Sequence, residues 1–236
     1  MGSARDEVVF LFDVDNTLLD NDRVIADLRR YLMSEVGEGS ADRYFTIFEQ
    51  LREELGHADY LGTLQRYRVA YPRDHRLLCV SAFLLEYPFA DRLYPGALEV
   101  LKRLAAIGPT VLLSDGDVVF QPRKIEQSGL GAAVDHQILV YIHKERELDD
   151  VAEQFPAEHY VLMDDKLRIL AAVKQAWGPR VTTVFVRQGH YAHDPDILAS
   201  YPPADLSIER IGDLLEYDIP TLLGAATVAT GGRREP

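Results

Sequence analysis

The fold of this chain is decided by one stretch near its start, residues 8–20, VVFLFDVDNTLLD. Five apolar residues in a row predict a strand that is buried on both faces. The run ends on Asp13 and Asp15, whose side chains point the same way because they are two residues apart. Burying unpaired charge is too costly, so we expect the pair where the strand leaves the sheet, at the edge where open α/β sheets bind ligands. A cation or a shared proton must relieve their repulsion, which predicts a metal site, an acid/base pair, or both.

The composition describes an ordinary globular chain with a strongly acidic surface. Its 236 residues allow one domain or a domain with an insert, and 47% of them are hydrophobic, which is ample for a core. The formal net charge of −13 argues against binding to the nucleic-acid backbone or to an anionic membrane. The same charge repels anionic substrates, so a site for one needs its own local cations. We expect a monomer or a homodimer that acts on a small molecule.

Cysteine content and hydropathy bear on the compartment. Cys79 is the single cysteine, so the chain cannot form an internal disulfide, which suits a reducing environment. No apolar run approaches the length of a membrane span, and no signal-peptide core follows the start. These observations predict a cytoplasmic protein.

Residues 21–90 predict a bundle of four helices inserted directly after the acidic pair. Strand-like runs vanish in this segment, and apolar residues recur at helical spacing. Gly37 and Gly39 separate the first two helices. The third and fourth are expected over 59–71 and 74–86, each followed by a proline.

After residue 90, apolar strands alternate with helices. This alternation predicts an α/β fold, a Rossmann-like three-layer α/β/α core with a parallel sheet and helices on both faces. The further strands are expected at 110–113, 138–142, 160–163, 181–186 and 206–208, and the helices at about 95–107, 120–129, 145–154, 166–177 and 210–216. The core therefore comprises 1–20 and 91–223, and 224–236 is expected to form a flexible tail.

Polar residues follow four of the predicted strands. Right-handed crossovers place the carboxyl ends of all strands at one edge of the sheet. The residues brought to that edge are Asp13 and Asp15, Ser114 and Asp115, Lys144, and Asp164 and Asp165. Several carboxylates around one point are hard oxygen ligands and suit Mg²⁺.

These residue types can support phosphoryl transfer. A carboxylate can act as nucleophile and form an aspartyl-phosphate, and a second carboxylate can protonate the leaving oxygen and later activate water. Mg²⁺ neutralises phosphate oxygens and holds the phosphoryl group in line. Ser114 would donate a hydrogen bond to a phosphate oxygen, and Lys144 would supply the missing cation.

Each residue also has a purely structural interpretation. The first acidic pair could form a turn or a helix N-cap, although neither explains why both acids follow a fully apolar strand. Taken alone, Ser114 is more simply a loop serine, and Lys144 a solvated lysine in a charged run. Asp164 and Asp165 could cap the helix that follows them, which is compatible with metal binding.

Three further residues are weaker candidates. Lys124 competes with Lys144 for the role of cation, but it lies within a predicted helix. His136 and His143 have no partner in the sequence and are interpreted as surface or packing residues.

The motifs resemble those of the haloacid dehalogenase (HAD) superfamily. Residues 13–17, DVDNT, resemble the DxDxT signature of that family. Its other three motifs resemble, in order, residues 112–114, Lys144 and residues 163–165. The segment 94–101, YPGALEVL, resembles the family's return into the core, and the helical insert resembles a C1-type cap. The resemblance spans about 8–215, nearly the whole chain.

The resemblance implies a role for each catalytic candidate. Asp13 would be the nucleophile and Asp15 the general acid/base. Ser114 and Lys144 would bind the phosphoryl group, and Asp115 is a further candidate for binding substrate beside them.

The resemblance also implies a Mg²⁺ site. Its ligands would be the Asp13 carboxylate, the Asp15 main-chain carbonyl and Asp164, with Asp165 acting through water. Two features depart from the commonest pattern of the family. Met163 replaces a glycine before the acids, and Glu145 replaces the proline after the lysine, which leaves open whether Asp164 or Asp165 is the direct ligand.

Three functions are compatible with this site. The first is a Mg²⁺-dependent phosphatase for a small phosphorylated metabolite. A 2-haloacid dehalogenase would also use Asp13 but needs neither a metal nor a second acid, so Asp15 favours the phosphatase. A phosphonate hydrolase is disfavoured because its branch uses a cap lysine and residues 21–90 contain none. Besides the phosphatase and the dehalogenase, the third function is that of a non-enzymatic HAD-like binding protein. The intact motifs argue against it.

The helical insert is expected to close over the site and exclude water. Its many Tyr, Phe and Arg residues, such as Arg66 and Tyr67, are interpreted mostly as bundle core and solvated face. The sequence therefore predicts a small substrate without specifying which one.

Overall fold

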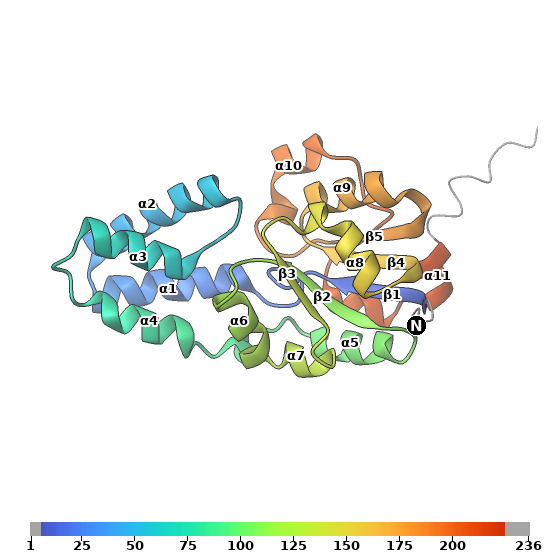
Figure 1. The fold of residues 1–236 in the computed structure, drawn as a ribbon, viewed down its shortest axis with the longest axis horizontal. Helices are drawn as coiled ribbons and strands as arrows, with labels where there is room; N and C mark the ends of the chain where they lie inside the picture. The colour runs from blue at the N-terminus through green and yellow to red at the C-terminus, as the bar shows by residue number, and fades with distance from the viewer. Residues whose placement is uncertain (1–5, 225–236) are drawn as a thin grey trace, which may run out of the picture.

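The computed structural model describes residues 6–224 and contains one parallel sheet (Figure 1). Its six strands are β1 (Asp6–Phe12), β2 (Thr110–Asp115), β3 (Ile138–Tyr141), β4 (Ala157–Asp164), β5 (Val181–Val186) and β6 (Leu206–Ile208). Their order is β3-β2-β1-β4-β5-β6, and every neighbouring pair is parallel. β1 thus lies inside the sheet between β2 and β4, as its unbroken apolar run predicts. The predicted Rossmann-like α/β fold is confirmed.

Two layers of helices sandwich the sheet. They are formed on one side by α5 (Ala97–Ala105), α6 (Phe120–Ser128), α7 (Leu130–Ala133) and α11 (Ile219–Gly224), and on the other by α8 (Leu148–Gln154), α9 (Leu167–Trp177) and α10 (Pro195–Ser200). Short 3₁₀ turns are η1 (Phe89–Arg92), η2 (Lys144–Arg146), η3 (Gly178–Arg180), η4 (Tyr191–His193) and η5 (Ile211–Leu215). No helix within 6–224 combines the length and the apolar character needed to cross a membrane.

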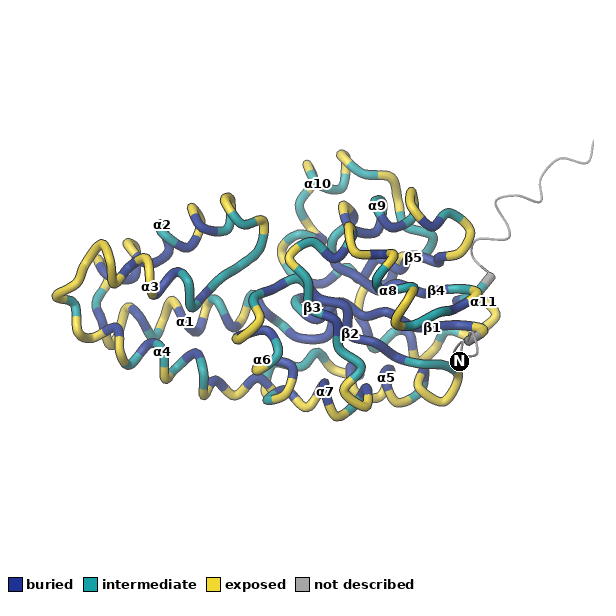
Figure 2. Tube along the Cα trace, in the orientation of Figure 1, coloured by how far each residue is buried: buried dark blue, intermediate teal, exposed yellow. Residues whose placement is uncertain are grey.

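Side chains of β1 alternate between the two layers. Phe10 and Phe12 belong to the apolar cluster of α5–α7, whereas Val9 and Leu11 belong to that of α8 and α9. This is the two-residue period of a strand that is covered on both faces. Most of β1 is buried, as Figure 2 shows for the centre of the sheet. The end of β1 is therefore a fixed platform for whatever follows it.

Four helices form a separate lobe, the cap, beside the carboxyl edge of the sheet (Figure 1). They are α1 (Asn21–Glu35), α2 (Glu38–Leu55), α3 (Tyr60–Ala70) and α4 (Leu77–Leu85). The apolar core of the cap continues into the layer of α5–α7. The rings of Tyr60 and Phe89 lie 5.0 and 5.8 Å from the ring of Phe120, which starts α6. Cap and core thus share one apolar cluster.

A buried carboxylate joins the two segments that connect the cap to the core. Asp27 of α1 accepts hydrogen bonds from the Tyr87 hydroxyl at 2.5 Å and from Arg92 at 2.9 and 3.2 Å. Burial favours a higher pKa for Asp27, but the hydrogen bonds from Tyr87 and Arg92 and the nearby arginine charges lower it below the ordinary value. The ionised form of Asp27 therefore holds the outgoing and returning segments together.

The observed helices differ from the predicted ones in detail. Gly39 lies inside α2 and does not separate helices. The predicted helix at 145–154 begins as the turn η2, and α8 starts only at Leu148. α7, α10 and α11 were not predicted, and α11 includes Gly224, the first residue of the predicted tail. The rest of that tail, 225–236, lies outside the described residues.

We expect Phe120→Ala to lower the free energy of unfolding by about 3–5 kcal/mol, because it leaves a cavity where the Phe120 ring packs against Tyr60 and Phe89. Urea denaturation followed by circular dichroism would measure the change. Val119→Ala is the matched control, since Val119 is 56% exposed and Phe120 only 1%. It should change stability by less than about 0.5 kcal/mol. A Phe120→Ala loss as small as that of the control would contradict a shared cluster.

Candidate functional site

The turn after β1 is held from several sides. Asn16 adopts a left-handed conformation, with φ of 63°, which asparagine tolerates better than most residues. Its side-chain amide donates to Asp22 at 3.0 Å, and the Asp22 N–H donates back at 3.1 Å. The Gln188 side chain donates to the Thr17 carbonyl at 3.0 Å. A Cβ on Gly189 would come within 2.5 Å of Asn16, so only glycine allows this approach. These contacts hold the backbone of the turn that carries Asp13 and Asp15.

Lys144 is the cation at the centre of the site. Its ammonium group lies 2.5 Å from Asp13 Oδ1 and 2.7 Å from Asp164 Oδ2, and it donates to the Leu113 carbonyl at 3.1 Å. Asp115 accepts the Lys144 N–H at 2.8 Å and so fixes the turn that carries the lysine. Burial favours a lower pKa for Lys144, but the neighbouring acids, Asp13 first, raise it above its ordinary value. Lys144 is therefore a buried and permanently charged partner of Asp13.

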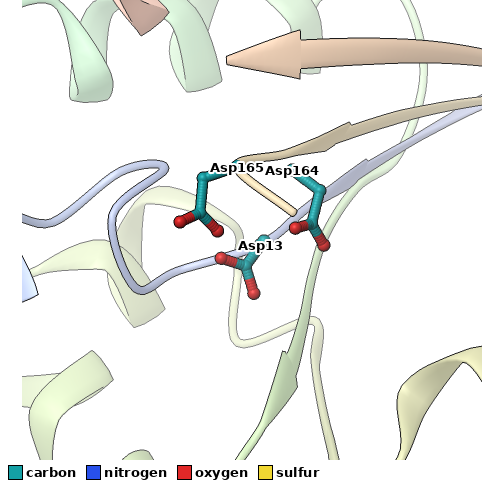
Figure 3. Close-up of side chains that lie close together, drawn as sticks. All are labelled: Asp13, Asp164 and Asp165. Atoms are coloured by element: carbon teal, nitrogen blue, oxygen red, sulfur yellow. The ribbon is translucent and has the colours of Figure 1, made fainter. Parts of the chain in front are cut away.

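Three buried carboxylates converge beside that lysine. Asp13, Asp164 and Asp165 offer oxygen atoms that lie within 4.8 Å of one another (Figure 3). Burial and the nearby Asp13 charge raise the pKa of Asp164 to about 6, although Lys144 opposes the shift. Burial also raises the pKa of Asp165 well above its usual value, against the opposing charge of Lys166. Burial thus disfavours the ionised forms of Asp164 and Asp165.

The two adjacent acids are used differently. Asp164 Oδ1 accepts the Lys166 N–H at 2.8 Å, so Asp164 caps the turn into α9 as well as binding Lys144. Both oxygens of Asp165 are buried without a hydrogen bond among the described residues. Buried carboxylate oxygens normally have partners.

The cluster is suited to a metal ion. Three carboxylates match the hard oxygen donors that Mg²⁺ prefers, and three of their oxygens, Asp164 Oδ2 and both of Asp165, lack a hydrogen bond among the described residues. The Asp15 carboxylate stands apart from the cluster, so only its main-chain carbonyl could serve as a ligand, as the resemblance implies.

Asp15 is held by a second buried lysine. Lys124 of α6 is fully buried and contacts both Asp15 oxygens, at 2.7 and 2.9 Å, and Asn21 Oδ1 at 3.1 Å. Gln121 donates to the Ser114 hydroxyl at 2.8 Å and to Asp15 at 3.4 Å. Asp15 therefore has one orientation in this structure, and Ser114 is connected to it through the Gln121 amide.

A cavity of about 360 Å³ lies between cap and core above these residues. This volume suits a small molecule. The core contributes Asp15 and Asp115 among other residues, and the cap contributes Phe48, Arg52 and His57 among others. Arg52 donates to the Tyr191 hydroxyl at 3.1 Å, which joins α2 to η4 across the cavity. The cap thus forms one wall of the cavity.

The structure brings the predicted site residues together at the carboxyl edge. Lys144 is buried against Asp13, so the interpretation as a solvated lysine is wrong. Ser114 is buried and bonded to Gln121, so it is not a simple loop serine. His143 packs against Gly56 of the cap, and His136 is exposed and paired with Glu126, as predicted for both.

Several residues of the site are only weakly indicated by the sequence. Lys124 lies within a predicted helix and is therefore the weaker candidate for the cation, yet it faces the site together with Gln121. A signal was present, since both lie on the same helical face as the buried apolar residues Phe120 and Ile125. Thr17, whose hydroxyl donates to Asp13 Oδ2 at 3.2 Å, belongs to the quoted motif but received no role.

The comparisons with known proteins agree with this geometry. The chain belongs to the haloacid dehalogenase-like hydrolase family, whose family model matches residues 8–184. It is 64% identical to a haloacid dehalogenase-like hydrolase from Burkholderia xenovorans LB400, with a TM-score of 0.89 over 92% of this chain and 99% of that one. No curated protein matched the chain.

More distant structures share the fold. YfnB from Bacillus subtilis, solved bound to magnesium, is 18% identical, with a TM-score of 0.58 over 90% of this chain and 98% of that one. L-2-haloacid dehalogenase from Xanthobacter autotrophicus is 19% identical, with a TM-score of 0.59 over 88% and 96%. At this identity the likeness concerns the fold alone.

We expect Lys124→Met to lower kcat about 10- to 100-fold, because Asp15 loses the hydrogen bonds that orient it. Methionine keeps most of the buried aliphatic volume, so the variant should fold. Steady-state kinetics and circular dichroism would test this. Lys102→Met, at an exposed position of α5, is the control and should match the unaltered protein. A normal kcat for a folded Lys124→Met protein would show that Lys124 has no part in orienting Asp15.

Proposed function

We propose that this hydrolase is a Mg²⁺-dependent phosphatase that acts on a small phosphorylated metabolite. One observation carries the proposal. The acid Asp15 lines the cavity, whereas Asp13 is buried against Lys144 and is not part of the lining. A second acid in that place can protonate a leaving oxygen. Release of halide needs no such proton, so the arrangement favours a phosphate ester over a haloacid.

The first half of the reaction uses Asp13 and Asp15. A carboxylate oxygen of Asp13 attacks phosphorus, and the bond between phosphorus and the leaving oxygen breaks as Asp15 donates its proton to that oxygen. Lys144 neutralises charge on Asp13 and on the phosphoryl oxygens. The product is an aspartyl-phosphate on Asp13 and a free alcohol.

The second half regenerates the enzyme. Asp15 takes a proton from water, whose oxygen attacks phosphorus, and the bond between phosphorus and Asp13 breaks. Lys124 and Gln121 hold the Asp15 carboxylate during both proton transfers. The Ser114 oxygen accepts from Gln121, and its hydroxyl hydrogen makes a long bond of 3.3 Å to the Asp115 carbonyl, which it would exchange for one to a phosphoryl oxygen.

The acidic cluster would hold the metal ion. The residues involved are Asp13, Asp164 and Asp165, with the Asp15 main-chain carbonyl. When bound, Mg²⁺ would supply positive charge to phosphoryl oxygens. A bound cation would stabilise Asp165 most, because neither of its oxygens has a hydrogen bond among the described residues.

We expect Asp13→Asn to abolish hydrolysis of p-nitrophenyl phosphate, by at least about 1,000-fold, because the amide cannot act as nucleophile. Release of p-nitrophenol in the presence of Mg²⁺ would measure it. Asp149→Asn, at an exposed position of α8, is the control and should keep full activity. Mg²⁺-dependent hydrolysis by Asp13→Asn would refute the assignment. Halide release from 2-chloropropionate without phosphatase activity would favour the dehalogenase, and neither activity would favour the binding protein.

We expect Mg²⁺ to raise the melting temperature of the protein, since a ligand that binds only the folded state stabilises it, by about 2.7 kcal/mol at 100 times its Kd. Asp165→Asn should lose most of this shift because it removes a ligand from the cluster. Thermal unfolding with MgCl₂, against NaCl of equal ionic strength, would measure it. An equal shift for both proteins would exclude Asp165 from the metal site, and no shift in the unaltered protein would exclude the site itself.

A further inference from the structure

The cavity lies on the side of the leaving group. Of the residues assigned to the reaction, Asp15 and Asp115 line it, whereas Asp13, Ser114 and Lys144 are buried outside its lining. Because Asp15 delivers a proton to the leaving oxygen, the space next to it receives the rest of the leaving group. The residues around this space therefore select the alcohol part of the substrate.

This space is cationic in a protein of the opposite charge. Acidic residues outnumber Lys and Arg by 38 to 25 in the whole chain. In the cavity lining the charged side chains are Arg52, Lys166 and Arg168 against Asp15 and Asp115. Both acids are engaged, Asp15 by Lys124 and Asp115 by the Lys144 N–H. The lining thus presents more positive than negative charge to a ligand.

Two of the three cations already lie against other groups. Lys166 directly follows Asp164 and Asp165, and its ammonium group lies 5.6 Å from the centre of the Tyr191 ring. Arg168 donates to Glu145 at 2.6 Å, and the side chain of Glu145 is only 8% exposed. Arg168 cannot make a new pair without weakening its pair with Glu145, and Lys166 lies beside the acids of the proposed metal site.

Arg52 is different. Its only ion-pair partner among the described residues is Glu49, one turn earlier on α2, at 2.6 Å, and Glu49 is 50% exposed and outside the cavity lining. Such exposed pairs contribute little and exchange easily. A guanidinium carries five N–H donors in a planar fork, so donors remain after the bonds to Glu49 and Tyr191. Arg52 is thus available to an anion inside the cavity.

The Tyr191 hydroxyl adds a second donor at the same place. It accepts the hydrogen bond from Arg52, which leaves its own hydrogen without an acceptor among residues 6–224. Tyr191 belongs to η4 of the core, whereas Arg52 belongs to the cap, and both line the cavity. An anion bound between them would therefore bridge cap and core over the leaving-group space.

We propose that Arg52 and Tyr191 bind a second anionic group, a carboxylate or a phosphate, on the leaving group of the substrate. The substrate class is then a small phosphate monoester of an alcohol that is itself an anion. This inference rests on the proposed phosphatase function. The inference accounts for a cationic cavity lining in an acidic protein. It also explains why an arginine of the cap and a tyrosine of the core meet at the place where the leaving group would lie.

The test compares substrates that differ in a single group. 3-Phosphoglycerate and glycerol 3-phosphate have the same three-carbon skeleton, but a carboxylate in the first is a hydroxymethyl group in the second. 2,3-Bisphosphoglycerate keeps the carboxylate and adds a second phosphate, so a kcat/KM above that of 3-phosphoglycerate would identify the phosphate as the bound anion. For the unaltered protein with Mg²⁺, kcat/KM should be about 10- to 100-fold higher for an anionic member of the series than for glycerol 3-phosphate.

Variants of Arg52 and Tyr191 identify the groups responsible. Arg52→Gln should reduce the preference at least about 10-fold, mainly through KM, and Arg52→Lys should restore part of it because the charge returns. Tyr191→Phe should reduce it less, since one neutral donor is lost. Arg66→Gln is the control, because Arg66 is an exposed cap arginine paired with Glu54 at 2.6 Å outside the cavity, and it should leave the preference unchanged.

The outcomes separate this inference from the proposed function. If the protein hydrolyses p-nitrophenyl phosphate but treats 3-phosphoglycerate, 2,3-bisphosphoglycerate and glycerol 3-phosphate alike, the phosphatase stands and the anion site is wrong. A preference that survives Arg52→Gln would also overturn it. If no phosphate ester is hydrolysed, the proposed function fails, and the anion site fails with it.

Discussion

The structure depends on one ammonium group placed between two carboxylates. Lys144 lies within 2.7 Å of both Asp13 and Asp164, at the point where the neighbouring strands β1 and β4 end together. Without it, two buried anions would repel each other at the centre of the fold. The same requirement recurs nearby, where Lys124 faces Asp15 and Lys166 lies near Asp165. Removing either Lys144 or Lys124 would therefore leave an acid at the carboxyl edge without its counter-charge.

Much of the fold and of the carboxyl edge could be predicted, because each strand and the polar residues that follow it are adjacent in the sequence. Runs of apolar residues predicted six strands, and the order of strands and helices predicted a parallel sheet with its polar ends on one edge. The role of Lys124 could not be predicted in this way, because its partner Asp15 lies 109 residues away and only the packing of α6 against the turn after β1 brings them together. Helical periodicity predicts that residue 124 lies on a buried face of its helix, but it does not predict which residue that face contacts.

In the cap, even less of the contact pattern could be predicted from the sequence. Interpreting its aromatic residues as bundle core was correct for Tyr67, which is buried, and interpreting Arg66 as part of a solvated face was correct as well. Arg52 has the same residue type and a similar helical setting as Arg66. What distinguishes them is that the face of α2 that carries Arg52 turns toward the core, a property of the folded chain and not of any segment of it.

The aromatic contact between Tyr60, Phe89 and Phe120 has a consequence for how such proteins diversify. The helix α6 supplies Phe120 to the apolar cluster of the cap and Lys124 to Asp15, so a single helix of the core serves both lobes. A foreign cap grafted between residues 20 and 91 would meet an α6 matched to the original. We therefore expect recombination of caps among relatives to succeed only when α6 is exchanged together with the cap. The unit that must be inherited together is then the four cap helices plus α6.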